Sequence, residues 1–165
     1  MMLGMSLSTF TMVHVVISLI AIVAGLVVMF GMLGSKAMPG LTAIFLLFTI
    51  LTNVTGFMFP FEQLLPSHMI AILSLVLLAV ACVALYVMQV SGPWRWIYVV
   101  TALASLYLNM FVLIVQAFLK IPSLHELAPG NPPNGPAFAV VQGIVLVFFV
   151  VVIAAEVRRF KPLSA

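Results

Sequence analysis

Charged residues are scarce in this sequence. The 165 residues include three Asp or Glu and six Lys or Arg, so that 5% are charged, while 65% are apolar. A soluble domain has about 25% charged and about 45–50% apolar residues. Too few charged groups are present to solvate a globular surface, which excludes a water-soluble enzyme. A membrane-spanning helix needs about 20 mainly apolar residues, so the chain has room for four or five such helices.

Common catalytic and metal-binding motifs are absent as well. Cys82 is the only cysteine, which excludes a disulfide within the chain and a metal site made of several thiolates. The sequence contains no Walker loop and no HExxH motif. No acidic or basic residue falls in the middle of an apolar stretch, and this weighs against a carboxylate proton relay or a voltage sensor.

The few charges separate five long apolar stretches, whose ends are marked by glycine and proline. The predicted helices cover residues 8–33, 41–59, 67–90, 94–118 and 137–158. A transmembrane β-strand would alternate polar and apolar residues, which 143–153 does not. The first stretch is too long for the apolar core of a cleaved signal peptide. The sequence therefore predicts an all-α fold, in which residues 1–165 form a single transmembrane domain of five helices.

Basic residues are distributed unequally between the two sides of the predicted membrane. One side holds Lys36, Arg95, Arg158, Arg159 and Lys161, and the other holds Lys120. Because the cytoplasmic loops of membrane proteins carry more Lys and Arg, we expect the N-terminus outside and the C-terminus in the cytoplasm. The net charge of +3 is then explained by topology and by contact with the lipid bilayer, and no nucleic-acid partner is expected.

Six polar residues within the predicted helices fall in the outer half of the predicted membrane. They are His14, Asn53, His68, Asn109, Gln116 and Gln142. In the first helix, Thr11, His14 and Ser18 recur at intervals of three and four residues, which places them on one helix face. Small polar residues, Asn and Gln also bind transmembrane helices to one another. These side chains are therefore predicted to face the bundle interior, either around a ligand or as packing contacts.

An ionisable side chain within a membrane span marks a candidate functional site. We therefore expect a small membrane protein with an outward-facing polar pocket for a small ligand or a redox cofactor, with a role in electron transport. One candidate is haem b, with His14 and His68 as its metal ligands. The other is a quinone or a similar amphipathic molecule, held by hydrogen bonds in an apolar pocket.

Three other functions remain open. Thioethers bind Cu(I) well, and seven of the eleven methionines are assigned to the outer half, so the protein could handle Cu(I). These methionines are Met1, Met2, Met5, Met12, Met58, Met69 and Met110. The chain could also be a structural or accessory subunit of a membrane complex, or part of a homo-oligomer, whose polar residues only pack helices. The third alternative is a small enzyme with His14 as an acid or base, but a binding protein is expected rather than an enzyme.

The longest predicted connection, over residues 119–136, holds five of the ten prolines. Proline restricts the backbone and removes hydrogen-bond donors, so we expect an ordered but irregular loop. It lies on the same side as the six polar residues. The loop is therefore either a lid over these residues or a surface tether.

Two segments of the sequence resemble a known group of proteins. They are YLNMFVLIVQAFLKIPSLHELAP, residues 107–129, and FAVVQG, residues 138–143. Both are similar to segments of uncharacterised small multi-pass inner-membrane proteins of bacteria. The resemblance implies a location in a bacterial inner membrane and no particular activity. It includes three of the six polar residues: Asn109, Gln116 and Gln142.

Overall fold

The structure is a computed structural model that describes residues 3–161, and these form helices joined by loops. Five helices are long and apolar enough to cross a membrane. They are α1 (Leu7–Leu33), α2 (Pro39–Phe57), α3 (Pro66–Cys82) with the π-helical turn η1 (Val83–Val87) that continues it, α4 (Trp94–Lys120) and α6 (Pro136–Arg159). The short helix α5 (Pro122–Leu127) lies between α4 and α6 along the chain.

The prediction of an all-helical chain with five helices able to span a membrane is confirmed, and every predicted helix end lies within three residues of the observed one. Proline begins α2, α3 and α6, because its fixed φ suits the first helical position and its missing N–H is not needed there. The largest difference is in the third helix, which ends at Val87 instead of residue 90. Gln89 and Val90 have positive φ angles of 52° and 47°, which a helix cannot accommodate.

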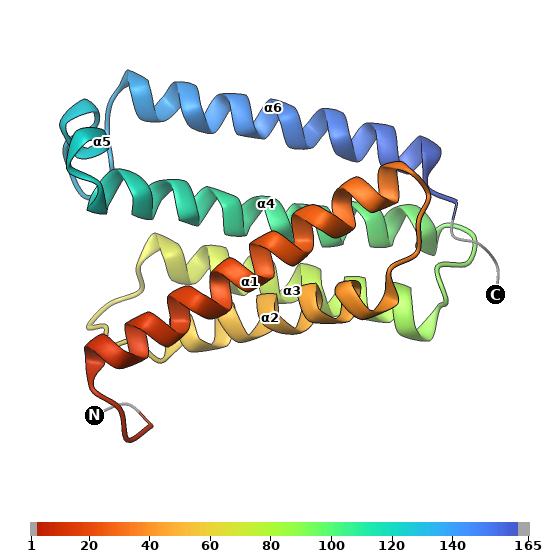
Figure 1. Cartoon of the computed structure of the whole chain (residues 1–165), viewed down its shortest axis with the longest axis horizontal. Helices are drawn as coiled ribbons and strands as arrows, with labels where there is room; N and C mark the ends of the chain where they lie inside the picture. The colour runs from red at the N-terminus through yellow and green to blue at the C-terminus, as the bar shows by residue number, and fades with distance from the viewer. Residues whose placement is uncertain (1–2, 162–165) are drawn as a thin grey trace.

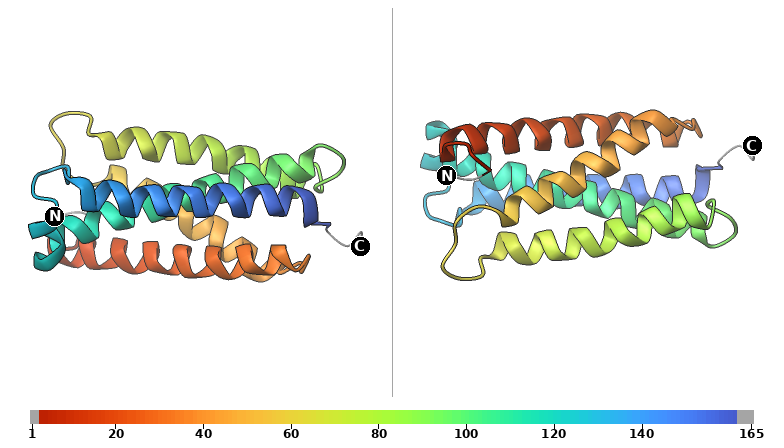
Figure 2. Two further views of the ribbon diagram at one scale, coloured as in Figure 1. Left: turned by 90° about the horizontal axis from the view of Figure 1, so that it is seen from above. Right: turned by 90° about the horizontal axis from the view of Figure 1, so that it is seen from below.

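The helices α1 to α4 form a bundle, and α6 packs on its outside against α4 and part of α1 (Figure 1). Helix α1 packs mainly on α2, and α3 packs mainly on α4. Figure 2 shows α1 and α3 on opposite sides of the molecule, with the other long helices between them. The described ends of the chain lie at opposite ends of the bundle (Figure 1), as expected for an odd number of long helices that run back and forth.

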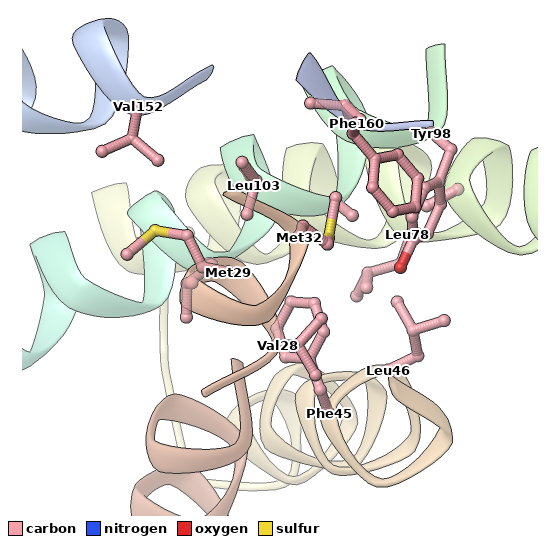
Figure 3. Packing of buried hydrophobic residues seen from close by; sticks show 14 of the residues in the cluster. Val28, Met29, Met32, Phe45, Leu46, Leu78, Tyr98, Leu103, Val152 and Phe160 are labelled. Atoms are coloured by element: carbon pink, nitrogen blue, oxygen red, sulfur yellow. The ribbon is translucent and has the colours of Figure 1, made fainter. Parts of the chain in front are cut away.

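The hydrophobic core occupies the half of the bundle that contains the C-terminal ends of α1 and α6. Val28, Met29 and Phe45 pack there against residues of α4 such as Leu103 (Figure 3). Gly25 lets the helices approach closely: a Cβ atom at this position would lie 2.6 Å from a methyl group of Leu106 and 2.8 Å from the Phe45 ring. Small residues are typical of such close helix contacts in membranes. The other half of the bundle holds the polar residues and is packed less tightly.

Candidate functional site

A pocket of about 480 Å³ lies between α1, α2, α3 and α4, in the half of the bundle away from the hydrophobic core. This volume is within the range of about 300–1,000 Å³ that is typical of small-molecule sites. Most of the wall is apolar. The polar side chains that line it are Thr11, His14 and Ser18 of α1, Thr52 and Asn53 of α2, Ser67 and His68 of α3, and Asn109, Gln116 and Lys120 of α4.

The structure brings together five of the six polar residues selected from the sequence: His14, Asn53, His68, Asn109 and Gln116 all line the pocket. Gln142 does not line it, because α6 stands outside the four-helix bundle. The Gln142 amide instead donates from Nε2 to the main-chain oxygen of Phe111, at 3.1 Å. Its Oε1 atom is buried and has no hydrogen-bond partner among the described residues. Gln142 therefore links α6 to α4, and the pocket belongs to α1 to α4.

Two asparagines connect the helices on one side of the pocket. Asn53 donates from Nδ2 to the main-chain oxygen of Thr49 at 2.8 Å and to the Ser74 hydroxyl of α3 at 3.1 Å. Asn109 donates from Nδ2 to the Thr49 hydroxyl at 3.5 Å. The side-chain NH₂ groups thus join α2 to α3 and α4. The two Oδ1 atoms accept no hydrogen bond from any described residue and are not fully buried, so they remain available as acceptors.

His14 binds α1 to α2 through one ring nitrogen and leaves the other free. Its Nδ1 lies 2.7 Å from the Thr55 hydroxyl oxygen, which itself lies 2.7 Å from the main-chain oxygen of Leu51. Since the Thr55 hydroxyl donates its proton to Leu51, its oxygen accepts from Nδ1–H of His14. A neutral imidazole with its proton on Nδ1 carries a lone pair on Nε2. His14 Nε2 is therefore a hydrogen-bond acceptor or metal ligand.

His68 has the opposite arrangement. The main-chain N–H of Leu65 donates to Nδ1 of His68 at 3.0 Å, at the start of α3. A neutral ring that accepts on Nδ1 carries its proton on Nε2, so Nε2 is a donor and has no lone pair for a metal. The ring is 5% exposed and lies between Phe57 and Phe61, with ring centroids 5.4 and 4.3 Å away. His68 is therefore held as a fixed hydrogen-bond donor.

These contacts bear on the two metal hypotheses. His68 Nδ1 accepts from the main-chain N–H of Leu65, and its Nε2 carries the proton. Of the two histidines at the pocket, His14 is then the one with a ring lone pair for a metal, so the pocket does not fit a haem with two axial histidines. None of the methionines among the described residues lines the pocket, and Met12 and Met69 are exposed on the outside of the bundle. The described residues contain no group of three or more His, Cys, Asp or Glu that could hold a metal ion. Met1 and Met2 lie outside the described residues.

From the sequence, Lys120 is not assigned to the pocket. Lys120 was used only to assign the sides of the membrane, yet it is the last residue of α4 and lies at the pocket. It follows Gln116 by four residues, which places both on one helix face. This spacing could have identified it. Lys120 adds the only positive charge among the side chains that line the pocket.

The pocket opens sideways between α1 and α4. Val15 and Leu19 of α1 and Leu113 and Gln116 of α4 line it and are also exposed on the outside of the bundle. In Figure 1 these two helices diverge toward the end that carries α5. The proline-rich connection does not close the opening, since beyond α4 only Ile121 lines the pocket. The connection therefore acts as a surface element, with α5 packed beside α4.

Comparison of the chain with protein-family models, with curated proteins and with solved structures finds no match.

Proposed function

We propose that this protein is a multi-pass membrane protein that binds a small amphipathic molecule in the pocket between α1 and α4, and that a quinone is the ligand class the pocket fits best. The observation that carries the proposal is the convergence of hydrogen-bonding side chains from four helices on one otherwise apolar pocket. Pockets of this kind bind small molecules, with the few polar groups orienting the ligand.

The polar groups of the pocket match both redox forms of a quinone. His68 Nε2–H, the Gln116 amide and the Lys120 ammonium group are donors for the two carbonyl oxygens of a quinone. His14 Nε2 and the free Oδ1 atom of Asn109 are acceptors for the hydroxyl groups of a quinol. A bound quinone would supply redox chemistry of two electrons and two protons, which the side chains of this chain lack. The protein's part is to bind and orient the ring.

The side opening supports a ligand that arrives from the membrane. Val15, Leu19 and Leu113 are apolar and exposed where the pocket opens, so in a bilayer they would face lipid chains. An apolar tail can leave the pocket there while the polar ring stays between the helices. With the orientation expected from the basic residues, the pocket lies toward the outer face of a bacterial inner membrane. This location is part of the proposal.

A second candidate is an accessory subunit whose polar residues only pack helices. Some hydrogen bonds favour the accessory subunit, because they join two helices of the same chain. One polar atom each of Asn53, Asn109 and His14 is used in this way. Gln116 separates the two candidates. It lines the pocket, and none of the hydrogen bonds among the described residues involves its side chain.

The test is binding of a quinone analogue with a short alkyl tail to the purified protein in detergent, measured by isothermal titration calorimetry. We expect saturable binding that weakens about fivefold in Gln116→Leu, since one hydrogen bond contributes about 1 kcal/mol. The matched control is Gln142→Leu, the same substitution in the same half of the bundle but outside the pocket, which should leave the affinity unchanged.

Equal binding by both variants and the unaltered protein, or uptake that does not saturate, would reject the quinone site and favour the accessory subunit. A visible absorption spectrum tests haem independently. A Soret band in protein expressed with an adequate haem supply would overturn the preference for a quinone.

A further inference from the structure

Glu156 is a fully buried acidic side chain at the end of the bundle opposite the pocket. Its exposed fraction is 0%, although it lies in α6, the helix that packs on the outside of the bundle. From the sequence, Glu156 appears only as the charge that ends an apolar stretch. The two other acidic residues, Glu62 and Glu126, are exposed.

The spacing of α6 explains why this side chain is buried. Phe149, Val152, Glu156 and Phe160 follow one another at steps of three and four residues, which places them on one helix face. The three apolar members belong to the hydrophobic core. Val152 of α6 and Phe160, which directly follows the last residue of α6, both extend into that core (Figure 3). Glu156 therefore occupies a core position between two apolar residues.

No described residue compensates a negative charge on Glu156. Neither Oε atom has a hydrogen-bond partner among the described residues. From α4, Arg95 donates instead to the main-chain oxygens of Val157, at 2.8 Å, and Phe160, at 2.6 Å. Besides Arg95, the titratable residue at this end of α4 is Tyr98, which is part of the hydrophobic core and carries no positive charge.

Among the described residues, the other segments next to this end of α6 bring no cation into the core. Lys36, in the loop whose Ser35 hydroxyl donates to the main-chain oxygen of Arg159, is exposed. The facing end of α1 contributes apolar residues such as Met29 and Met32. Arg158 and Arg159 on α6 itself are exposed. A carboxylate buried without a partner is strongly disfavoured, because it loses its hydration and gains no opposite charge. A neutral carboxylic acid in the same place loses much less.

We propose that Glu156 is a proton-binding site: its carboxyl group is protonated in the folded protein at neutral pH, and its ionisation loosens the C-terminal end of α6 from α4. Arg95 makes no hydrogen bond to Glu156: its Nη1 donates to the two carbonyl groups that end α6. An ionised Glu156 would have to gain water or the guanidinium as a partner, and either change disturbs the contact between this end of α6 and α4. The site is independent of the pocket and of the ligand proposed for it.

The direct test is infrared spectroscopy of the full chain at neutral pH in a detergent without ester groups, because an ester carbonyl stretch overlaps that of a carboxylic acid. A protonated carboxylic acid has a carbonyl stretch that a carboxylate lacks, and the chain has only three acidic side chains, so assignment is simple. We expect a protonated-acid band in the unaltered protein, its loss in Glu156→Gln and its retention in the control Glu62→Gln. Absence of the band from the unaltered protein, or its persistence in Glu156→Gln, would overturn the proposal.

Thermal unfolding gives a second test. If the folded state binds one more proton than the unfolded state, the free energy of unfolding decreases as the pH rises. Between about pH 5 and about pH 7, where the unfolded carboxyl is ionised and the folded one holds its proton, the melting temperature should fall more steeply for the unaltered protein than for Glu156→Gln. Glu156→Gln should fold, because the amide is neutral and similar in shape. Equal slopes would show that Glu156 binds no extra proton in the folded state and would overturn the proposal.

Discussion

Gly25 allows a sharp test of how closely α1 approaches its neighbours. In Gly25→Ala the new Cβ atom would lie 2.6 Å from Leu106 Cδ1 and 2.8 Å from two atoms of the Phe45 ring. Both neighbours are fully buried, at 0% exposed, so neither side chain has open space into which it can move. Overpacking of a core in this way costs about 1–3 kcal/mol.

Gly143 is the matched control because it is also a helical glycine, in α6, but a Cβ atom there would meet nothing within 4 Å. Replacing a helical glycine by alanine stabilises a helix by about 0.5–1 kcal/mol. This gain is common to both variants and cancels in their comparison. We therefore expect Gly25→Ala to be about 1–3 kcal/mol less stable than Gly143→Ala.

The assay is reversible unfolding in mixed micelles with an increasing fraction of denaturing detergent, followed by circular dichroism. A Gly25→Ala protein as stable as Gly143→Ala would refute the reasoning. It would mean that α1, α2 and α4 do not make this close contact.

Two further predictions concern the contact between α1 and α2 and the direction of insertion. His14→Leu and Thr55→Val should each lower the free energy of unfolding, because each removes the hydrogen bond between these two side chains. In the double variant the two losses should differ from their sum by about 1 kcal/mol. Strictly additive losses would show that the two side chains do not form this bond. A reporter that is active only in the cytoplasm, fused after residue 165, should be active, and activity of a reporter restricted to the outer side would reverse the expected orientation.

Most of the helical architecture could be predicted because its determinants are local. Stretches free of charge are long enough to span a membrane. Pro39, Pro66 and Pro136 begin helices because of their own backbone chemistry, which does not depend on the rest of the fold. Five polar residues of the pocket could also be predicted, since depth along each helix assigns them to one end. The short helix α5 and the turn after Val87 were missed, because each depends on how the chain closes between two packed helices.

The differences between the sequence-based expectations and the structure concern which way a helix faces. Gln142 was grouped with the pocket by depth, but depth does not show that α6 lies outside the bundle. In the sequence, Lys120 and Glu156 stand at the borders of apolar stretches, and neither position shows which way its side chain points. Lys120 lies at the pocket, and Glu156 lies in the core. In helices that are apolar on all sides, the sequence has little periodicity that could distinguish the protein-facing side from the lipid-facing one.

The sequence by itself determined that the chain is helical, how many helices can span a membrane and at which end the polar residues gather. These properties follow from apolar length and from backbone chemistry, which act within one helix. The tertiary structure decided which polar residues share a pocket, which nitrogen of each histidine is free, and that Glu156 is enclosed. These depend on the rotation of each helix and on its neighbours, which are decided by side-chain packing between segments far apart in the chain.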